Sequence, residues 1–361
     1  MDPLTWTGAL DWVNPLLGGA VLVVLLGIAM QMVWPLLPTS PAGARRLGQI
    51  TTAGIAAAAA LLIVYVVGGS FMGAEAGIFG GMAQRLLPVW IALIVTFALS
   101  ITFKRRLGLY GKLFDSTVGM IGFGLVMFWV YTGLFGGGFD MIVTHDSLSQ
   151  TSGMKNKLPG TPLARAEDGD YPWFLLGGDN LARDVFSRLI KGAWVVIQIA
   201  PMATVFAFMV GITLGLPAGY YGGKLDVFLS FLANLILAFP VILIFYLLVT
   251  PEIVLTGLPN YMAIVLFIFP LVFLGVLLNT RLRTQPSTRT PVLVVVLGLV
   301  GWLYLAMISD DGALVRTQTY EIPGLPAFLD FLDIGPGLLV VFVAVVFVNA
   351  PTVFRIVRGL A

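Results

Sequence analysis

The chain contains no cysteine among its 361 residues, and only 11% of its residues are charged. The lack of cysteine excludes a disulfide scaffold, a thiolate metal site and a cysteine nucleophile. Soluble domains carry about 25% charged residues, so this chain lacks the polar surface that a soluble enzyme or a disordered protein needs. Its net charge of +2 is too small to indicate nucleic acid as a partner.

Hydrophobic residues make up 58% of the chain, and the mean hydropathy is +0.98. A bilayer core about 30 Å thick is crossed by about 20 apolar residues in a helix. We therefore expect an all-α, polytopic membrane protein with about nine transmembrane helices. The apolar stretches lie near 16–37, 50–69, 86–103, 117–137, 193–219, 225–249, 260–279, 291–308 and 336–356.

The basic residues predict the orientation, because cytoplasmic loops are enriched in lysine and arginine. With the N-terminus outside and the C-terminus inside, the inner loops hold twelve basic residues, and the outer side holds two apart from one long loop. The inner set is Arg45, Arg46, Lys104, Arg105, Arg106, Lys112, Lys224, Arg281, Arg283, Arg289, Arg355 and Arg358, and the outer pair is Arg85 and Arg316.

The centres of the expected spans contain no Asp, Glu, Lys, Arg or His, the groups that carry the coupling ion in most secondary transporters. The polar exceptions are Gln31, Gln198, Asn234 and Asn349. They either bond within the protein or, for the last three, line a polar path. We expect no catalytic site, bound cofactor or metal site, and His145 is expected to be a solvated loop residue.

The long outer loop, residues 138–192, ends in a segment that predicts a helix over 178–192. Asp179 can cap it, Leu181, Val185 and Leu189 form one apolar stripe, and Asp184 and Arg188 are spaced as a helical ion pair.

This segment, GGDNLARDVFSRLIKGA, and the later GITLGLPAGYYGGKLDVFLSFLANLILAFPVILI resemble the inner-membrane permease subunits of oligopeptide, dipeptide and nickel ABC importers. The signature of that family is G-T-D-x-x-G-R-D-x-x-S-R-L-I-x-G-A. Gly178 stands where the family has threonine and Ala182 where it has glycine. The signature positions that we carry over are Gly178, Asp179, Arg183, Asp184, Ser187, Arg188, Gly192, Gly219, Asp226 and Pro240.

The resemblance implies a type I importer core and a permease subunit that is not itself an enzyme. It implies four partners in the bacterial inner membrane system: a second homologous permease, two ATP-binding subunits that bind ATP and magnesium, and an extracytoplasmic solute-binding protein. Gln198, Asn234 and Asn349 are the candidates for the pathway, and Arg355 and Arg358 approach the region that couples to the ATPase. The substrate is expected to be a peptide or a related small solute.

Compared with the family plan, the chain has extra parts. We expect an additional three-helix region at 1–103, the first part of the core at 104–250, an inserted helix pair with an acidic outer loop at 251–335, and a core helix at 336–361. The E-A-A-x-x-x-G coupling pattern of the family is expected to follow Arg358 in a longer chain. The alternative is a non-transporting membrane scaffold. A secondary transporter is disfavoured by the missing intramembrane charges.

Overall fold

The computed structural model describes residues 2–34, 41–164, 166, 169–309 and 336–361. The described chain is mostly helical. The long loop between the helices that end at Gly138 and begin at Val185 is largely irregular, and it contains one short antiparallel pair, β1 (Thr161–Pro162) and β2 (Trp173–Phe174). The described chain divides into two compact units, Met1–Val195 and Val196–Ala361. The acidic loop expected before the last helix lies outside the described residues.

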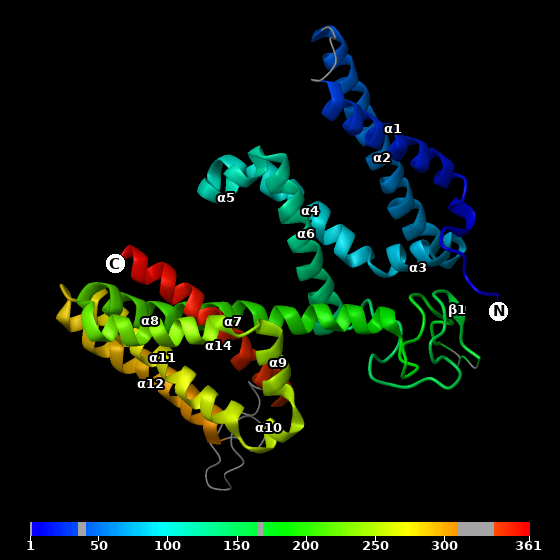
Figure 1. The fold of residues 1–361 in the computed structure, drawn as a ribbon. Coiled ribbons are helices and arrows are strands. Elements are labelled where there is room, and N and C mark those ends of the chain that lie inside the picture. The colour runs from blue at the N-terminus through cyan, green and yellow to red at the C-terminus, as the bar shows by residue number, and fades with distance from the viewer. Residues whose placement is uncertain (1, 35–40, 165, 167–168, 310–335) are drawn as a thin grey trace. The chain divides into compact units, whose positions relative to one another are not determined.

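The first unit begins with two long helices, α1 (Val13–Val33) and α2 (Pro41–Met72), which pack along each other (Figure 1). Gly27 allows this close approach, because a side chain there would collide with Thr51. Gln31 Nε2 donates to Thr51 Oγ1 at 2.9 Å, which confirms that Gln31 bonds across helices. The remaining helices are α3 (Gly77–Arg85), α4 (Leu87–Phe103), α5 (Gly108–Lys112) and α6 (Thr117–Gly133).

The second unit contains most of α7 (Val185–Tyr221), followed by α8 (Gly223–Ala238), α9 (Val241–Val249), α10 (Pro251–Leu255), α11 (Leu258–Arg281), α12 (Pro286–Ser309) and α14 (Pro336–Leu360). Its core joins α7, α11 and α14, with Ala203, Ala263 and Val346 fully buried. Three aromatic rings fix the centre of this core, since the Phe206 ring lies 4.9 Å from Phe267 and 5.2 Å from Phe342 between centroids.

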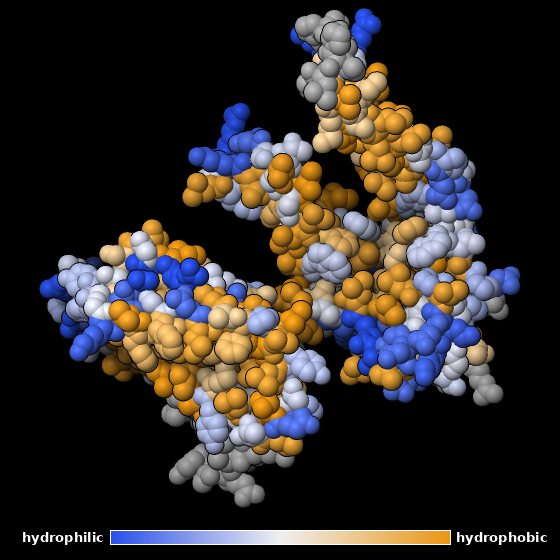
Figure 2. All heavy atoms as spheres, viewed as in Figure 1, coloured by the Kyte–Doolittle hydropathy of each residue, from blue (hydrophilic) through white to orange (hydrophobic). Residues whose placement is uncertain are grey.

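Seven helical segments of the described chain are long and apolar enough to cross a membrane. The bent pair α8 and α9 supplies an eighth if it counts as one span. The remaining expected span, near 291–308, falls on α12, whose described apolar stretch, Pro286–Trp302, is shorter. Figure 2 shows hydrophobic side chains covering the helices and hydrophilic ones gathering over the loop around β1. The all-α polytopic class is therefore confirmed, and the count of nine stays a prediction.

The N-terminal segment is bonded to the long loop. The Leu4 amide donates to Gly160 O at 2.9 Å, and Trp173 Nε1 donates to Asp2 O at 3.2 Å. The Ile78 amide also donates to Thr5 O at 2.9 Å, which ties the same segment to the start of α3. The N-terminal segment is therefore in contact with the loop and with α3, and the orientation across the membrane stays a prediction.

Single-cysteine labelling tests the orientation directly, because the chain has no native cysteine. Leu148 in the long loop is 76% exposed, and Tyr221 at the other end of α7 is 75% exposed. In intact cells a membrane-impermeant maleimide should label a Leu148→Cys variant and should label a Tyr221→Cys variant only after permeabilisation. The opposite pattern would reverse the topology.

Candidate functional site

The start of the family-like signature folds as a tight turn and not as a helix. Asp179 Oδ1 accepts hydrogen bonds from the backbone amides of Leu181 at 2.8 Å and Arg183 at 2.9 Å. The left-handed φ of 61° at Ala182 turns the backbone so that the Arg183 amide points toward Asp179. The expected helix over 178–192 is thus too long, since α7 begins at Val185. The helix begins late because the Leu181 and Arg183 amides donate to the Asp179 side chain and so cannot donate to helical carbonyl oxygens.

The two signature arginines converge on the Asp179 carboxylate. Arg183 Nη2 lies 2.8 Å from Asp179 Oδ2, and Arg188 Nη1 contacts the same oxygen. Although partial burial opposes ionisation, the backbone hydrogen bond of Arg183, its side chain and the Leu181 amide hold the pKa of Asp179 well below its ordinary value. The predicted pair of Asp184 with Arg188 is wrong, because Arg188 reaches the earlier aspartate across the turn.

Asp184 is the true N-cap of α7, and its side chain is fully buried. Its Oδ1 accepts from the Phe186 amide at 3.1 Å, and its Oδ2 accepts from the Ser187 hydroxyl at 2.6 Å and the Thr144 hydroxyl at 2.8 Å. Burial raises the pKa of Asp184, but the hydrogen bonds from His145, Ser187 and Thr144 outweigh it and leave that pKa below its ordinary value. A buried carboxylate therefore joins the loop to the helix.

His145 belongs to this cluster, so the expectation of a solvated histidine is wrong. Its side chain is only 12% exposed, with Nδ1 3.1 Å from Asp184 Oδ2 and Nε2 2.9 Å from the Tyr171 carbonyl oxygen. Each ring nitrogen of His145 therefore has an oxygen of the protein within hydrogen-bond distance. Sequence reasoning missed His145 and Thr144 because they lie about 40 residues from Asp184 along the chain.

The buried face of the first turns of α7 also differs from the expected stripe. Phe186 and Ile190 are each 2% exposed, whereas Leu181 and Leu189 are exposed. Moving the helix start to Val185 leaves Leu181 outside the helix, so the four-residue spacing no longer defines the packed face.

Gly178 and Gly192, which belong to the same signature, behave differently. A Cβ at Gly178 would collide with the backbone carbonyl of Met154, which explains why the threonine of the family does not fit in this loop. Gly192 is exposed, and a Cβ there would meet nothing within 4 Å.

The other end of α7 presents a row of small residues to α14. A Cβ at Gly211 would lie 2.6 Å from Val353, one at Gly215 would lie 3.0 Å from Phe354 O, and one at Gly219 would lie 2.8 Å from Arg358 O. The four-residue spacing of these glycines places them on one face and lets the helix backbones touch. Gly211 and Gly215 are not among the signature positions carried over from the sequence, although their four-residue spacing to Gly219 is visible there.

Two charged members of the expected set meet at this end. Arg358 Nε lies 2.5 Å from Asp226 Oδ1, and Arg358 Nη2 donates to Asp226 Oδ2 at 2.8 Å. Arg355 is exposed. Among the described residues it makes no ion pair.

Pro240 breaks the helix, because it has no amide hydrogen to donate and disfavours helical backbone in the residue before it. Phe239 and Pro240 are both extended, and α8 and α9 meet there at 83°. The chain therefore bends sharply at Pro240 between α8 and α9.

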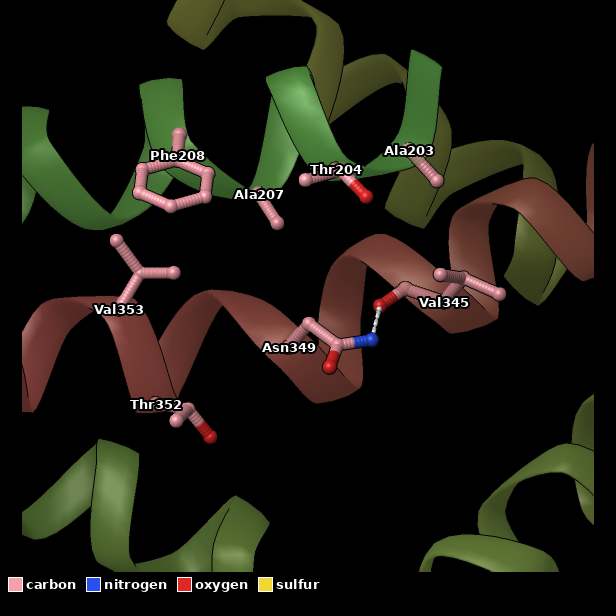
Figure 3. Close-up of a pocket in the computed structure, with 8 residues that line it drawn as sticks. All are labelled: Ala203, Thr204, Ala207, Phe208, Val345, Asn349, Thr352 and Val353. Carbon is pink, nitrogen blue, oxygen red and sulfur yellow. Dashed lines mark hydrogen bonds between the residues drawn. The ribbon is translucent and has the colours of Figure 1, made fainter. Parts of the chain in front are cut away.

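Of the three pathway candidates, Asn349 lies in a cleft. The cleft has a volume of about 190 Å³ between α7 and α14 (Figure 3). Its lining is Ala203, Thr204, Ala207, Phe208, Val345, Asn349, Thr352 and Val353. Asn349 Nδ2 donates to Val345 O at 2.7 Å. Gln198 is half-buried on α7 and Asn234 is exposed on α8. Neither of these two residues lines the cleft.

Within the described ranges, no group of three or more His, Asp or Glu side chains could hold a metal ion. The arrangement consists of structural ion pairs, a helix-packing face and a weakly polar cleft.

The comparisons with known proteins agree on one class. The chain is 38% identical over 106 residues to a dipeptide transport system permease protein, DppC, of Alkalihalophilus pseudofirmus, covering 29% of this chain and 32% of the relative. It is 36% identical over 80 residues to a glutathione transport system permease protein, GsiD, of Pectobacterium atrosepticum, covering 22% and 27%. It is 30% identical over 191 residues to a peptidoglycan transport system permease protein, YejE, of Agrobacterium fabrum, covering 50% and 47%.

The matches thus cover less than half the length of each of these relatives. No family model matches the chain, and no solved structure matches it. The resemblance stated from the signature is nevertheless confirmed by several independent relatives, all named as permease proteins of transport systems. The chain is a multi-pass protein of the bacterial inner membrane that is similar to the permease subunits of peptide ABC importers.

Proposed function

We propose that the chain is the permease subunit of an ATP-binding cassette importer and forms part of the path by which peptides cross the inner membrane. The similarity to permease proteins of dipeptide and glutathione transport systems carries this proposal. The helical architecture supports it, because the seven apolar segments leave the chain embedded in the bilayer.

The partners follow from the chemistry that this chain lacks. Uphill transport needs an energy source, and the centres of the expected spans carry no ionisable group that could couple to an ion gradient. We therefore assign ATP and magnesium to two separate ATP-binding subunits. A second permease would complete the pathway, and an extracytoplasmic solute-binding protein would deliver the peptide. Asn349 is the pathway candidate that the cleft favours, because its Oδ1 can accept a peptide N–H.

Transport by the isolated complex tests the proposal. The chain is tagged in its host, purified with the subunits bound to it, and reconstituted into liposomes that contain ATP and magnesium. Radiolabelled alanyl-alanine is added outside together with the binding protein. We expect uptake that requires ATP and fails with a non-hydrolysable ATP analogue.

Three other results would contradict this function. Uptake without ATP would indicate a secondary transporter. A stable complex with neither uptake nor peptide-stimulated ATP hydrolysis would indicate a non-transporting scaffold. ATP binding by this chain, freed of other subunits, would contradict the assignment of ATP to its partners.

A further inference from the structure

The Asp226–Arg358 ion pair joins helices that are far apart in sequence. The two residues are 132 positions apart, and the guanidinium contacts both oxygens of the carboxylate. Asp226 lies in the first turn of α8, and Arg358 lies in the last turn of α14. Asp226 therefore also complements the dipole of its own helix. The two-point contact fixes the direction as well as the distance between the helix ends.

The same end of α14 is in close contact with α7. The glycine face of Gly211, Gly215 and Gly219 brings the backbones together over residues 353–361. Phe354, buried at 3% exposure, packs with Ala218 of α7 and Ala233 of α8. The end of α14 is consequently in contact with two helices at once, by packing on α7 and by packing and charge on α8.

We propose that Asp226 and Arg358 are a positioning pair that passes a displacement of the inner end of α14 on to α8 and α7. This inference rests on the proposed function. ATP is hydrolysed in the cytoplasm, so a partner ATPase acts on the inner ends of the helices, where the basic residues place this end of α14. The exposed Arg355, one turn before Arg358, leaves the outer face of the helix open to such a partner.

The pair is suited to coupling more than to stability. The Arg358 side chain is 41% exposed and that of Asp226 is 21% exposed. Ion pairs with this exposure contribute little to folding, and the buried contacts of Phe354 and the glycine face remain when the pair is removed. Loss of the pair should therefore leave a folded subunit in which α14 moves without carrying α8 with it.

The test measures peptide taken up per ATP hydrolysed in the reconstituted complex. Asp226→Asn and Arg358→Gln should each lower this ratio at least about fivefold, the scale of a modest coupling between sites, while ATP hydrolysis continues. The swapped double variant, Asp226→Arg with Arg358→Asp, should recover part of the ratio. Lys224→Gln, an exposed charge two residues from Asp226, is the matched control and should keep the ratio of the wild type.

Three outcomes would overturn the inference. Single variants with the ratio of the wild type would show that the pair does not couple the helices. A lowered ratio that the swap does not restore, or that accompanies a lower unfolding temperature, would indicate local damage. A wild-type complex with no ATP-dependent uptake would refute the proposed function itself. This outcome is seen in the wild type, whereas the other two are seen only in the variants.

Discussion

Replacing Gly211 with leucine is expected to separate α14 from α7 and to prevent the second unit from packing. A Cβ at this position would lie 2.6 Å from Val353 and 2.9 Å from the Phe354 amide nitrogen, closer than real atoms approach. Backbone cannot yield as a flexible side chain does, so the leucine must push the helices apart. Overpacking usually costs about 1–3 kcal/mol, and we expect at least the upper end here because the collision includes backbone.

The measurement is the unfolding temperature of the purified subunit, followed by fluorescence-detected size exclusion. Gly192→Leu on the same helix is the matched control, since a Cβ there meets nothing within 4 Å. It carries the same change in helix propensity and hydrophobicity without the collision. Equal unfolding temperatures for the two variants would show that the glycine face does not decide the packing of α14.

Replacing Asp184 with alanine is expected to loosen the long loop from the start of α7. The change removes the N-cap and leaves the buried His145 ring and the Thr144 and Ser187 hydroxyls without their shared acceptor. Leaving buried hydrogen-bonding groups unsatisfied costs about 1–3 kcal/mol. Hydrogen exchange followed by mass spectrometry should show faster exchange over 144–190 than in the wild type.

Asp146→Ala is the control, because Asp146 is an exposed aspartate in the same loop that accepts hydrogen bonds from groups close in sequence.

Lowering the pH should speed hydrogen exchange in the loop, as the Asp184→Ala variant does. The native pKa of Asp184 lies below its ordinary value of 3.8, so the unfolded chain binds more protons as the pH falls. The stabilisation that Asp184 gives to the loop, measured as slow hydrogen exchange, is therefore complete above about pH 4 and is lost as the pH falls below it. An Asp184→Asn variant should lack this acid-dependent component, and an unchanged pH profile would contradict the role of Asp184.

The signature segment shows how far sequence reasoning extends. Its residues predicted a capped helix leading into a span, and α7 is that helix. The cap and the helix start were misplaced by several residues, because an Asx-type turn at Asp179 and a cap at Asp184 look alike in sequence: both are acidic residues ahead of an apolar run. The outcome depends on His145 and Thr144, which approach only after the loop has folded.

The sequence by itself determined that the chain is an all-α membrane protein and that it resembles peptide permeases. Composition decides the first point because a bilayer accepts only backbone that is hydrogen-bonded within the protein, and a long run of specific residues decides the second. Tertiary structure alone decided which groups meet: Arg358 with Asp226, the glycines of α7 with α14, and Asn349 in a cleft from which Asn234 is absent. These pairings join positions more than 100 residues apart, and no local period or propensity carries information over that distance.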